Sequence, residues 1–265
     1  MDFATLMALE PHGPDTYVGA GPRYPWGGLY GGQIVAQGLR AASLTVEPGF
    51  FVHSLHAYFI RRGDAEEPIR FEVDRVRNGR SFVTRNVIAR QSVGAILSMS
   101  ASFQVAEGGL AIQTAEMPVV AGPDEVKPES WSPMFDRRFV PTGRAPGKAQ
   151  AWLRMVEPVG DDPLLQACAL TYVSDDLPTD AVVTLHPENV TLEDMEAGRF
   201  WSASLDHAVW FHRPLRAEDW HLHDFTCHGY LGSRGLSLGH VLTAEGVHVA
   251  TIAQEVLFRA AAPNS

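Results

Sequence analysis

The stretch A-S-L-D-H-A-V-W-F-H-R-P at residues 203–214 decides the fold prediction. Its residues favour β structure and it ends in a proline, so the segment is predicted to form one strand. Because side chains alternate along a strand, Ser204 and Asp206 are expected on one face and His207 on the other. Polar and aromatic residues therefore fall on both faces, which a purely structural strand with one wet side would not require.

A similar stretch occurs earlier in the chain. Residues 56–62, H-A-Y-F-I-R-R, align with residues 207–213, H-A-V-W-F-H-R, at a spacing of 151 residues (207 − 56). Gly94 and Gly246 each lie in the middle of a pair of β-patterned runs at nearly the same offset. The chain is therefore predicted to contain two diverged copies of one α+β unit.

Each copy is predicted to consist of a helix followed by an antiparallel sheet. Apolar spacing predicts a helix over 32–43, and the acidic start with Pro163 predicts another from about 161 to 175. The predicted strands are 51–60, 68–77, 81–91 and 95–105 in the first copy, and 200–213, 220–230, 236–243 and 247–259 in the second. Prolines recur between 106 and 150 and are expected to interrupt regular structure there. We therefore expect a first unit over 1–110, a proline-rich linker over 111–150 and a second unit over 151–265.

Composition limits the classes of function. The 265 residues carry a net charge of −10, which argues against a general nucleic-acid binder. No apolar run is long enough to span a bilayer, and the first residues lack the pattern of a secretory signal. Cys168 and Cys227 are the two cysteines and suggest no disulfide framework. A cytoplasmic protein without membrane insertion is expected.

Three polar residues stand out from the patterns around them. Helical spacing places Asp175 on the face that packs on the sheet, although a helix ending earlier would leave it as a loop acid. Gln254 shares an apolar strand face and must be hydrogen-bonded there, which backbone groups could also satisfy. Ser204 is a strand serine, a type of residue that usually has no special role.

Two further features could bind substrate. The glycines before Gln33 leave backbone N–H groups at a helix N-terminus, which suits an oxyanion, although glycine there could serve packing alone. His53 is another candidate for oxyanion or substrate binding. Arginines without an intervening acid form a patch that suits a phosphorylated ligand, unless it is an ordinary solvated strand face: Arg75, Arg77, Arg80, Arg85 and Arg90.

Two motifs are expected to be without function. Residues 235–239 match G-x-S-x-G, but the flanking runs are β-patterned and lack the helix that a serine-hydrolase nucleophile elbow requires. His221 and His223 lack a convincing third metal ligand. No metal and no cofactor are therefore expected.

Taken together, the motifs resemble those of the acyl-CoA thioesterase II family, whose members are double-hotdog proteins. They are G-G-Q-I-V-A-Q-G-L at 31–39, H-S-L-H-A-Y-F-I-R-R-G-D at 53–64, R-N-G-R-S-F at 77–82, S-A-S-F-Q at 100–104, Y-V-S-D at 172–175, S-L-D-H-A-V-W-F-H-R-P at 204–214, S-R-G at 233–235 and A-Q-E at 253–255. The chain departs from the family at Arg61-Arg-Gly-Asp64, at Gln254-Glu-Val256 and in its proline-rich linker. These departures bear on the acyl pocket and the substrate range more than on the reaction.

The resemblance implies a double-hotdog α+β fold, in which each unit is a helix wrapped by an antiparallel sheet. It also implies hydrolysis of fatty acyl-CoA, with the water held by the residues at three family positions: Asp175, Ser204 and Gln254. Backbone N–H groups near Gly32 and Gln33 would stabilise the thioester oxygen, and Arg75, Arg77 and Arg80 could contact the phosphates of CoA. A homo-oligomer is expected because fused hotdog units leave sheet edges and an apolar face.

Two other functions remain open at this point. A non-catalytic protein that binds acyl-CoA or an acyl carrier is compatible with the same fold. An enoyl-CoA hydratase would need an Asp and a His around one water, and the adjacent Asp206 and His207 are expected to point to opposite faces.

Overall fold

A computed structural model describes residues 1–142, 145–188 and 190–261. Its helices are α1 (Phe3–Met7), α2 (Gly31–Ser43), the 3₁₀ turn η1 (Pro123–Glu125), α3 (Pro163–Ser174), α4 (Pro178–Leu185) and α5 (Leu192–Glu196). Its strands are β1 (Glu10–Pro11), β2 (Thr16–Gly19), β3 (Phe50–Phe59), β4 (Ile69–Asn78), β5 (Phe82–Gln91), β6 (Gly94–Val105), β7 (Phe135–Phe139), β8 (Lys148–Met155), β9 (Phe200–Ser204), β10 (Asp206–Phe211), β11 (His221–Leu231), β12 (Arg234–Thr243) and β13 (His248–Ala260).

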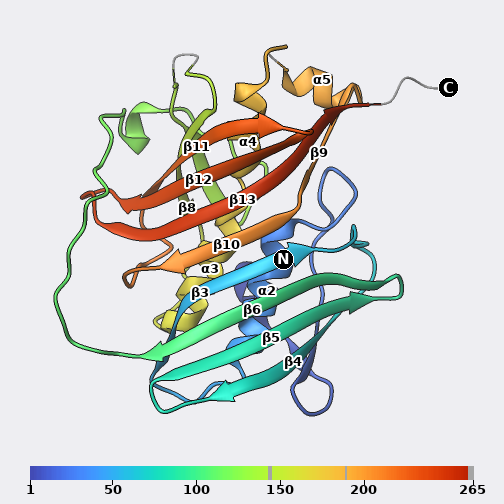
Figure 1. The fold of residues 1–265 in the computed structure, drawn as a ribbon, viewed down its shortest axis with the longest axis vertical. Helices are drawn as coiled ribbons and strands as arrows, with labels where there is room; N and C mark the ends of the chain where they lie inside the picture. Colours follow the sequence, from blue (N-terminus) through green and yellow to red (C-terminus); the bar gives the residue numbers. More distant parts are fainter. Residues whose placement is uncertain (143–144, 189, 262–265) are drawn as a thin grey trace.

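The strands form one antiparallel sheet that runs through both halves of the chain (Figure 1). Its order is β1-β2-β4-β5-β6-β3-β10-β13-β12-β11-β8-β7, with β9 paired to β13. The two longest helices, α2 and α3, pack against each other on one side of this sheet. The predicted α+β class is confirmed, and α2 and α3 begin and end within two residues of the predicted positions. The predicted helix-then-sheet order is incomplete, because two strands come before the long helix in each half: β1 and β2 before α2, and β7 and β8 before α3.

The repeated segments meet at the centre of the sheet. Strand β3 pairs with β10, with Ala57 opposite His207 and His56 opposite Ala208. His56 is exposed, and the centroid of its ring lies 5.0 Å from that of Trp210. His207, by contrast, is fully buried on the inner face. The histidines aligned by sequence thus face opposite sides of the sheet, so the structural correspondence of the two copies is shifted relative to the sequence alignment here.

The segment 200–213, predicted as one strand, is two strands separated at Leu205. On β9 Ser204 lies opposite Val256, whereas on β10 Ala208 lies opposite Ala253, so the pairing shifts by one residue. Such a bulge reverses the alternation of faces beyond it. Ser204 and His207 therefore both point to the inner face, and the prediction that they lie on opposite faces is wrong.

A side chain holds this bulge in place. The Asp206 carboxylate accepts a hydrogen bond from the backbone N–H of Glu255 at 2.6 Å, while the N–H of Leu205 donates to the Glu255 carbonyl at 2.9 Å. Asp206 thus satisfies a ladder N–H that the extra residue would otherwise leave unpaired.

The proline-rich segment is only partly a linker. Residues 106–122 contain no helix or strand, but η1, β7 and the start of β8 lie within 111–150. The expectation that prolines interrupt every regular element there is wrong. Pro133 and Pro141 flank β7 without entering it, and β7 pairs with β8 at the outer edge of the sheet.

Candidate active site

Asp175 lies at the centre of the candidate site. It is the C-cap of α3, a helix that begins at Pro163 after Asp162, whose carboxylate accepts a hydrogen bond from the N–H of Leu164 at 2.9 Å. The helix therefore ends just before Asp175, as the loop alternative supposed. The side chain is nevertheless buried, with 7% of the residue exposed, because α2 covers it.

The N-terminus of α2 meets this carboxylate directly. The backbone N–H of Gly32 donates to Asp175 Oδ2 at 2.9 Å. A Cβ atom at Gly32 would lie 2.2 Å from the carbonyl oxygen of Tyr172, and one at Gly31 would lie 2.5 Å from Asp175 Oδ2. Only glycine permits this approach of the two helices. The positive end of α2 thereby compensates a carboxylate placed at the negative end of α3.

Ser204 and Gln254 complete the cluster from the sheet. Ser204 Oγ donates to Asp175 Oδ1 at 3.2 Å, and Gln254 Nε2 donates to Ser204 Oγ at 2.8 Å. Gln254 is fully buried on β13, as its apolar register predicted. The structure thus brings together the three residues that the family resemblance selected, from α3, β9 and β13.

Burial determines the acid–base behaviour of Asp175. It raises the pKa of Asp175 from 3.8 to about 7, while hydrogen bonds from Gln254, Gly32 and Ser204 act in the opposite direction. An ionised carboxylate can accept about four hydrogen bonds. With a pKa close to neutral and acceptor capacity left, Asp175 is suited to take a proton from a nearby donor.

The predicted oxyanion and substrate groups have different surroundings. The N–H of Gly32 is occupied by the Asp175 carboxylate, so its position differs from the one expected for an oxyanion donor. The Gln33 side chain is fully buried between Tyr24 and Gln37, and the role of its backbone N–H stays a prediction. His53 lies at a bulge of β3 and contacts Ser102 Oγ at 2.8 Å, away from the Asp175 cluster.

The arginine patch divides into structural and exposed members. Arg85 is 2% exposed and donates to five oxygens, including both oxygens of Thr45, so it is part of the core. Arg75 makes a two-bond ion pair with Asp15 at 2.9 and 2.8 Å. Arg77 and Arg80 stay exposed at the end of β4. Strand β4 lies four strand spacings from β10, about 19 Å along the sheet.

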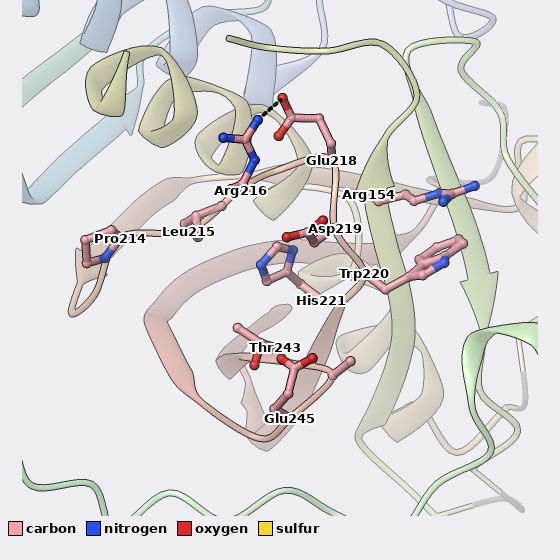
Figure 2. Close-up of a pocket in the computed structure, with 11 residues that line it drawn as sticks. Arg154, Pro214, Leu215, Arg216, Glu218, Asp219, Trp220, His221, Thr243 and Glu245 are labelled. Atoms are coloured by element: carbon pink, nitrogen blue, oxygen red, sulfur yellow. Dashed lines mark ion pairs between the residues drawn. The ribbon is translucent and has the colours of Figure 1, made fainter. Parts of the chain in front are cut away.

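A cleft of about 610 Å³ lies elsewhere, between the β10–β11 loop, the β12–β13 turn and Arg154 of β8 (Figure 2). Asp175, Ser204 and Gln254 are not among its lining residues. Its two arginines pair with acids. Arg216 pairs with Glu218 at 3.8 Å, as Figure 2 shows, and with Asp161 at 3.0 Å. Arg154 pairs with Asp136 at 3.2 Å. The cleft is therefore not assigned to the same site.

The G-x-S-x-G segment and the cysteines lie in regular elements. Ser237 is within β12, so no sharp strand-to-helix turn exposes it. Cys168 lies on α3 and Cys227 on β11, and both are free and buried.

His207 contacts the candidate cluster, although its sequence pattern predicts it on the face opposite Ser204. It lies 2.5 Å from Gln254 Oε1 through Nδ1. A strict period-2 pattern places it on the face opposite Ser204, and only the bulge at Leu205 brings the two to the same face. The sequence signal for this placement is Asp206, directly before His207. An aspartate can accept a backbone N–H that a bulge leaves unpaired, as Asp206 does from Glu255.

Two family profiles match consecutive parts of the chain. The acyl-CoA thioesterase N-terminal domain matches residues 21–104, and the acyl-CoA thioesterase C-terminal domain matches residues 111–258. The chain belongs to the acyl-CoA thioesterase II family.

Relatives of this thioesterase family match over nearly the whole chain. Human acyl-coenzyme A thioesterase 8 is 31% identical over 96% of this chain and 88% of its own length. Acyl-CoA thioesterase 2 of Haemophilus influenzae is 32% identical over 87% of each chain. The acyl-CoA thioesterase II structure from Mycobacterium marinum superposes with a TM-score of 0.85 at 37% identity and covers 99% of both chains.

The double-hotdog architecture of the family is confirmed. A hotdog-fold protein from Alicyclobacillus acidocaldarius superposes with a TM-score of 0.81 over 98% of both chains, at 20% identity, which shows the fold alone. Among the described residues, none of the helices has the length and apolar character needed to cross a membrane.

Proposed function

We propose that this chain hydrolyses fatty acyl-CoA to a free fatty acid and CoA, with Asp175 as general base. The observation that carries the proposal is the buried cluster in which Ser204 lies 3.2 Å from Asp175 and Gln254 lies 2.8 Å from Ser204. Family membership and the printed names of the relatives support an acyl-CoA substrate.

The reaction adds one water across the thioester. Asp175 accepts a proton from water, whose oxygen attacks the thioester carbon while Ser204 and Gln254 orient it. The C–S bond of the tetrahedral intermediate then breaks, the acid leaves, and the CoA sulfur takes up the proton. General-base assistance contributes about 10²–10⁴-fold, and a backbone donor to the developing oxyanion, assigned here to the N–H of Gln33, contributes about 3–4 kcal/mol.

The exposed arginines remain candidates for the phosphates of CoA. Arg77 and Arg80 are free to contact solvent at the end of β4, whereas Arg75 would first have to leave Asp15. In the proposed complex the first two residues therefore contribute more than Arg75.

The hydratase alternative fits the contacts of His207 poorly. Its Nδ1 faces Gln254 Oε1 at 2.5 Å and its Nε2 faces Ser174 Oγ at 2.8 Å. Both ring nitrogens are therefore engaged within the protein, whereas a hydratase histidine must offer one to the substrate. Asp206 is engaged with the backbone of Glu255.

A panel of acyl-CoA thioesters tests the proposal. The purified protein is mixed with saturated and α,β-unsaturated acyl-CoAs of several chain lengths, and free thiol is followed with a chromogenic disulfide reagent. We expect steady release of thiol from saturated substrates and its loss in Asp175→Asn. Binding of acyl-CoA without thiol release would overturn the enzyme assignment. Loss of the unsaturated chromophore without thiol release would instead support a hydratase.

A further inference from the structure

The polar cluster extends beyond Asp175, Ser204 and Gln254. His207 is fully buried on the inner face of β10. Its Nδ1 lies 2.5 Å from Gln254 Oε1, and its Nε2 lies 2.8 Å from Ser174 Oγ. A continuous series of contacts therefore runs from Ser174, the last residue of α3, through the sheet and back to Asp175, the next residue in the chain.

The direction of each hydrogen bond follows from the carboxylate. Ionised Asp175 can only accept, so the Ser204 hydroxyl must donate its single hydrogen to Oδ1. Ser204 then has only lone pairs left for Gln254, so the amide must present its Nε2 to Ser204. The other end of the amide, the acceptor Oε1, necessarily faces His207.

The same reasoning fixes the imidazole. A neutral histidine has one N–H, and Gln254 Oε1 requires it on Nδ1 of His207. Nε2 is then an acceptor, and the donor beside it is the hydroxyl of Ser174. That hydroxyl also lies 3.0 Å from the carbonyl of Thr171, but its one hydrogen is needed by the nearer Nε2. Burial lowers the pKa of His207 to about 4, so the ring is neutral near pH 7.

We propose that His207, held by Ser174, is a positioning residue that fixes the amide orientation of Gln254 and thereby directs the Ser204 hydroxyl at Asp175. This inference rests on the proposed thioesterase function and adds two residues to it. Without the Nδ1–H, the Gln254 amide can turn and present Oε1 to Ser204. Ser204 would then donate to Gln254 and leave Asp175 without that donor.

A change in the pH profile distinguishes positioning from mere packing. Burial raises the pKa of Asp175, while hydrogen bonds from Gln254, Gly32 and Ser204 lower it. Turning the Gln254 amide removes the donors from Gln254 and Ser204 and therefore raises the pKa of the carboxyl further. Because the base must be ionised, the midpoint of kcat against pH should move to higher pH when the series is broken at His207.

Three variants and one matched control make the test. His207→Leu removes both contacts, Ser174→Ala removes the donor to Nε2, and His207→Asn keeps an N–H near the Nδ1 position. The control is His223→Leu. His223 is 1% exposed on β11, and neither of its ring nitrogens has a hydrogen-bond partner among the described residues.

We expect His207→Leu to lower kcat at least 10-fold, with a much smaller change in KM and a higher pH midpoint. Ser174→Ala should show a weaker form of the same changes, His207→Asn should recover much of the loss, and His223→Leu should match the wild type. A folded His207→Leu with wild-type kcat and pH midpoint overturns the proposal. So does a loss of kcat that His207→Asn does not recover and that leaves the midpoint unchanged.

The tautomer supplies a test that needs neither a variant nor turnover. In protein labelled with ¹⁵N-histidine, the ring nitrogens of residue 207 should report hydrogen on Nδ1 and none on Nε2 between pH 8 and pH 9, where Asp175 is ionised. Hydrogen on Nε2 instead would overturn the inference even if the wild type is an active thioesterase. A wild type that shows the Nδ1–H tautomer but releases no thiol would instead contradict the proposed function.

Discussion

Replacing Asp175 by Asn should abolish most activity and, at alkaline pH, stabilise the fold. Asparagine keeps an acceptor for Gly32 and a similar shape, but it cannot take a proton from water. We expect kcat to fall by 10²-fold or more, the size of general-base assistance. In the wild type, kcat should rise with pH around a midpoint near 7, because burial raises the pKa of Asp175 to about 7.

The effect on stability follows from the same burial. The pKa of Asp175 is raised from 3.8 in the unfolded chain to about 7 in the folded protein, so the folded state holds the proton more tightly. The contribution of this group to stability is therefore complete below the unfolded pKa and is lost as the pH rises through the folded pKa. The full shift corresponds to roughly 4 kcal/mol at most. About 2–3 kcal/mol of it is lost between pH 5 and pH 8, a loss that the Asn variant should not show.

The assay combines denaturant unfolding at pH 5 and pH 8 with thiol release. Asp180→Asn is the matched control, because burial also raises the pKa of Asp180 on α4 to about 7. That variant should share the gain in stability at pH 8 and keep wild-type turnover.

Two results would refute this reasoning. A folded Asp175→Asn variant with near-native turnover removes Asp175 from the mechanism. A variant whose free energy of unfolding falls from pH 5 to pH 8 as steeply as that of the wild type contradicts the argument from burial.

Three further predictions concern the nucleophile, the helix contact and the assembly. Ser204→Ala should be impaired but active. Wild-type enzyme mixed rapidly with excess acyl-CoA should release CoA without a stoichiometric burst. If intact-protein mass spectrometry detects an acyl adduct that disappears in Ser204→Ala, catalysis is covalent instead. Gly32→Ala should lower both kcat and the denaturation midpoint, because its Cβ would lie 2.2 Å from the Tyr172 carbonyl oxygen. Gly38→Ala should be close to neutral, because its Cβ would lie 3.3 Å from the flexible end of Met99 and in ordinary contact with Leu97 at 3.6 Å. Equal effects of the two substitutions would count against the helix-contact argument. Light scattering should give a homo-oligomer at micromolar concentration, and a 29.0 kDa monomer would contradict this.

Much of the fold could be predicted from the sequence because its elements follow their expected periods. The helix over 32–43 and the four strands after it lie within about two residues of their predicted bounds. Residues 203–214 departed from their predicted pattern, because a bulge is a one-residue change of register that alternation cannot reveal. Strands β7 and β8 were not predicted. Prolines flank β7 closely, and a short edge strand leaves a weak pattern. Strand β8 is buried at almost every residue and therefore shows no alternation.

The site was only partly predictable for a different reason. Asp175, Ser204 and Gln254 were selected by family motifs, since each alone had an ordinary structural explanation. Their contacts depend on how α2, α3 and the sheet pack, which local sequence does not encode. The same holds for Arg85. Its sequence context is that of a surface arginine, but its side chain is buried in the core and donates hydrogen bonds to Thr45.

The pairing of β3 with β10 also has a consequence for how the chain folds. It joins Ala57 to His207, which are 150 residues apart (207 − 57), and the contact of Gly32 with Asp175 spans 143 residues. Closing a loop of that length costs about 4 kcal/mol of chain entropy before any contact forms. Hairpins within each half close much shorter loops and should form earlier. During refolding, thiol-releasing activity should therefore return after most of the secondary structure, because the Asp175 carboxylate acquires its Gly32 contact only when the two halves dock.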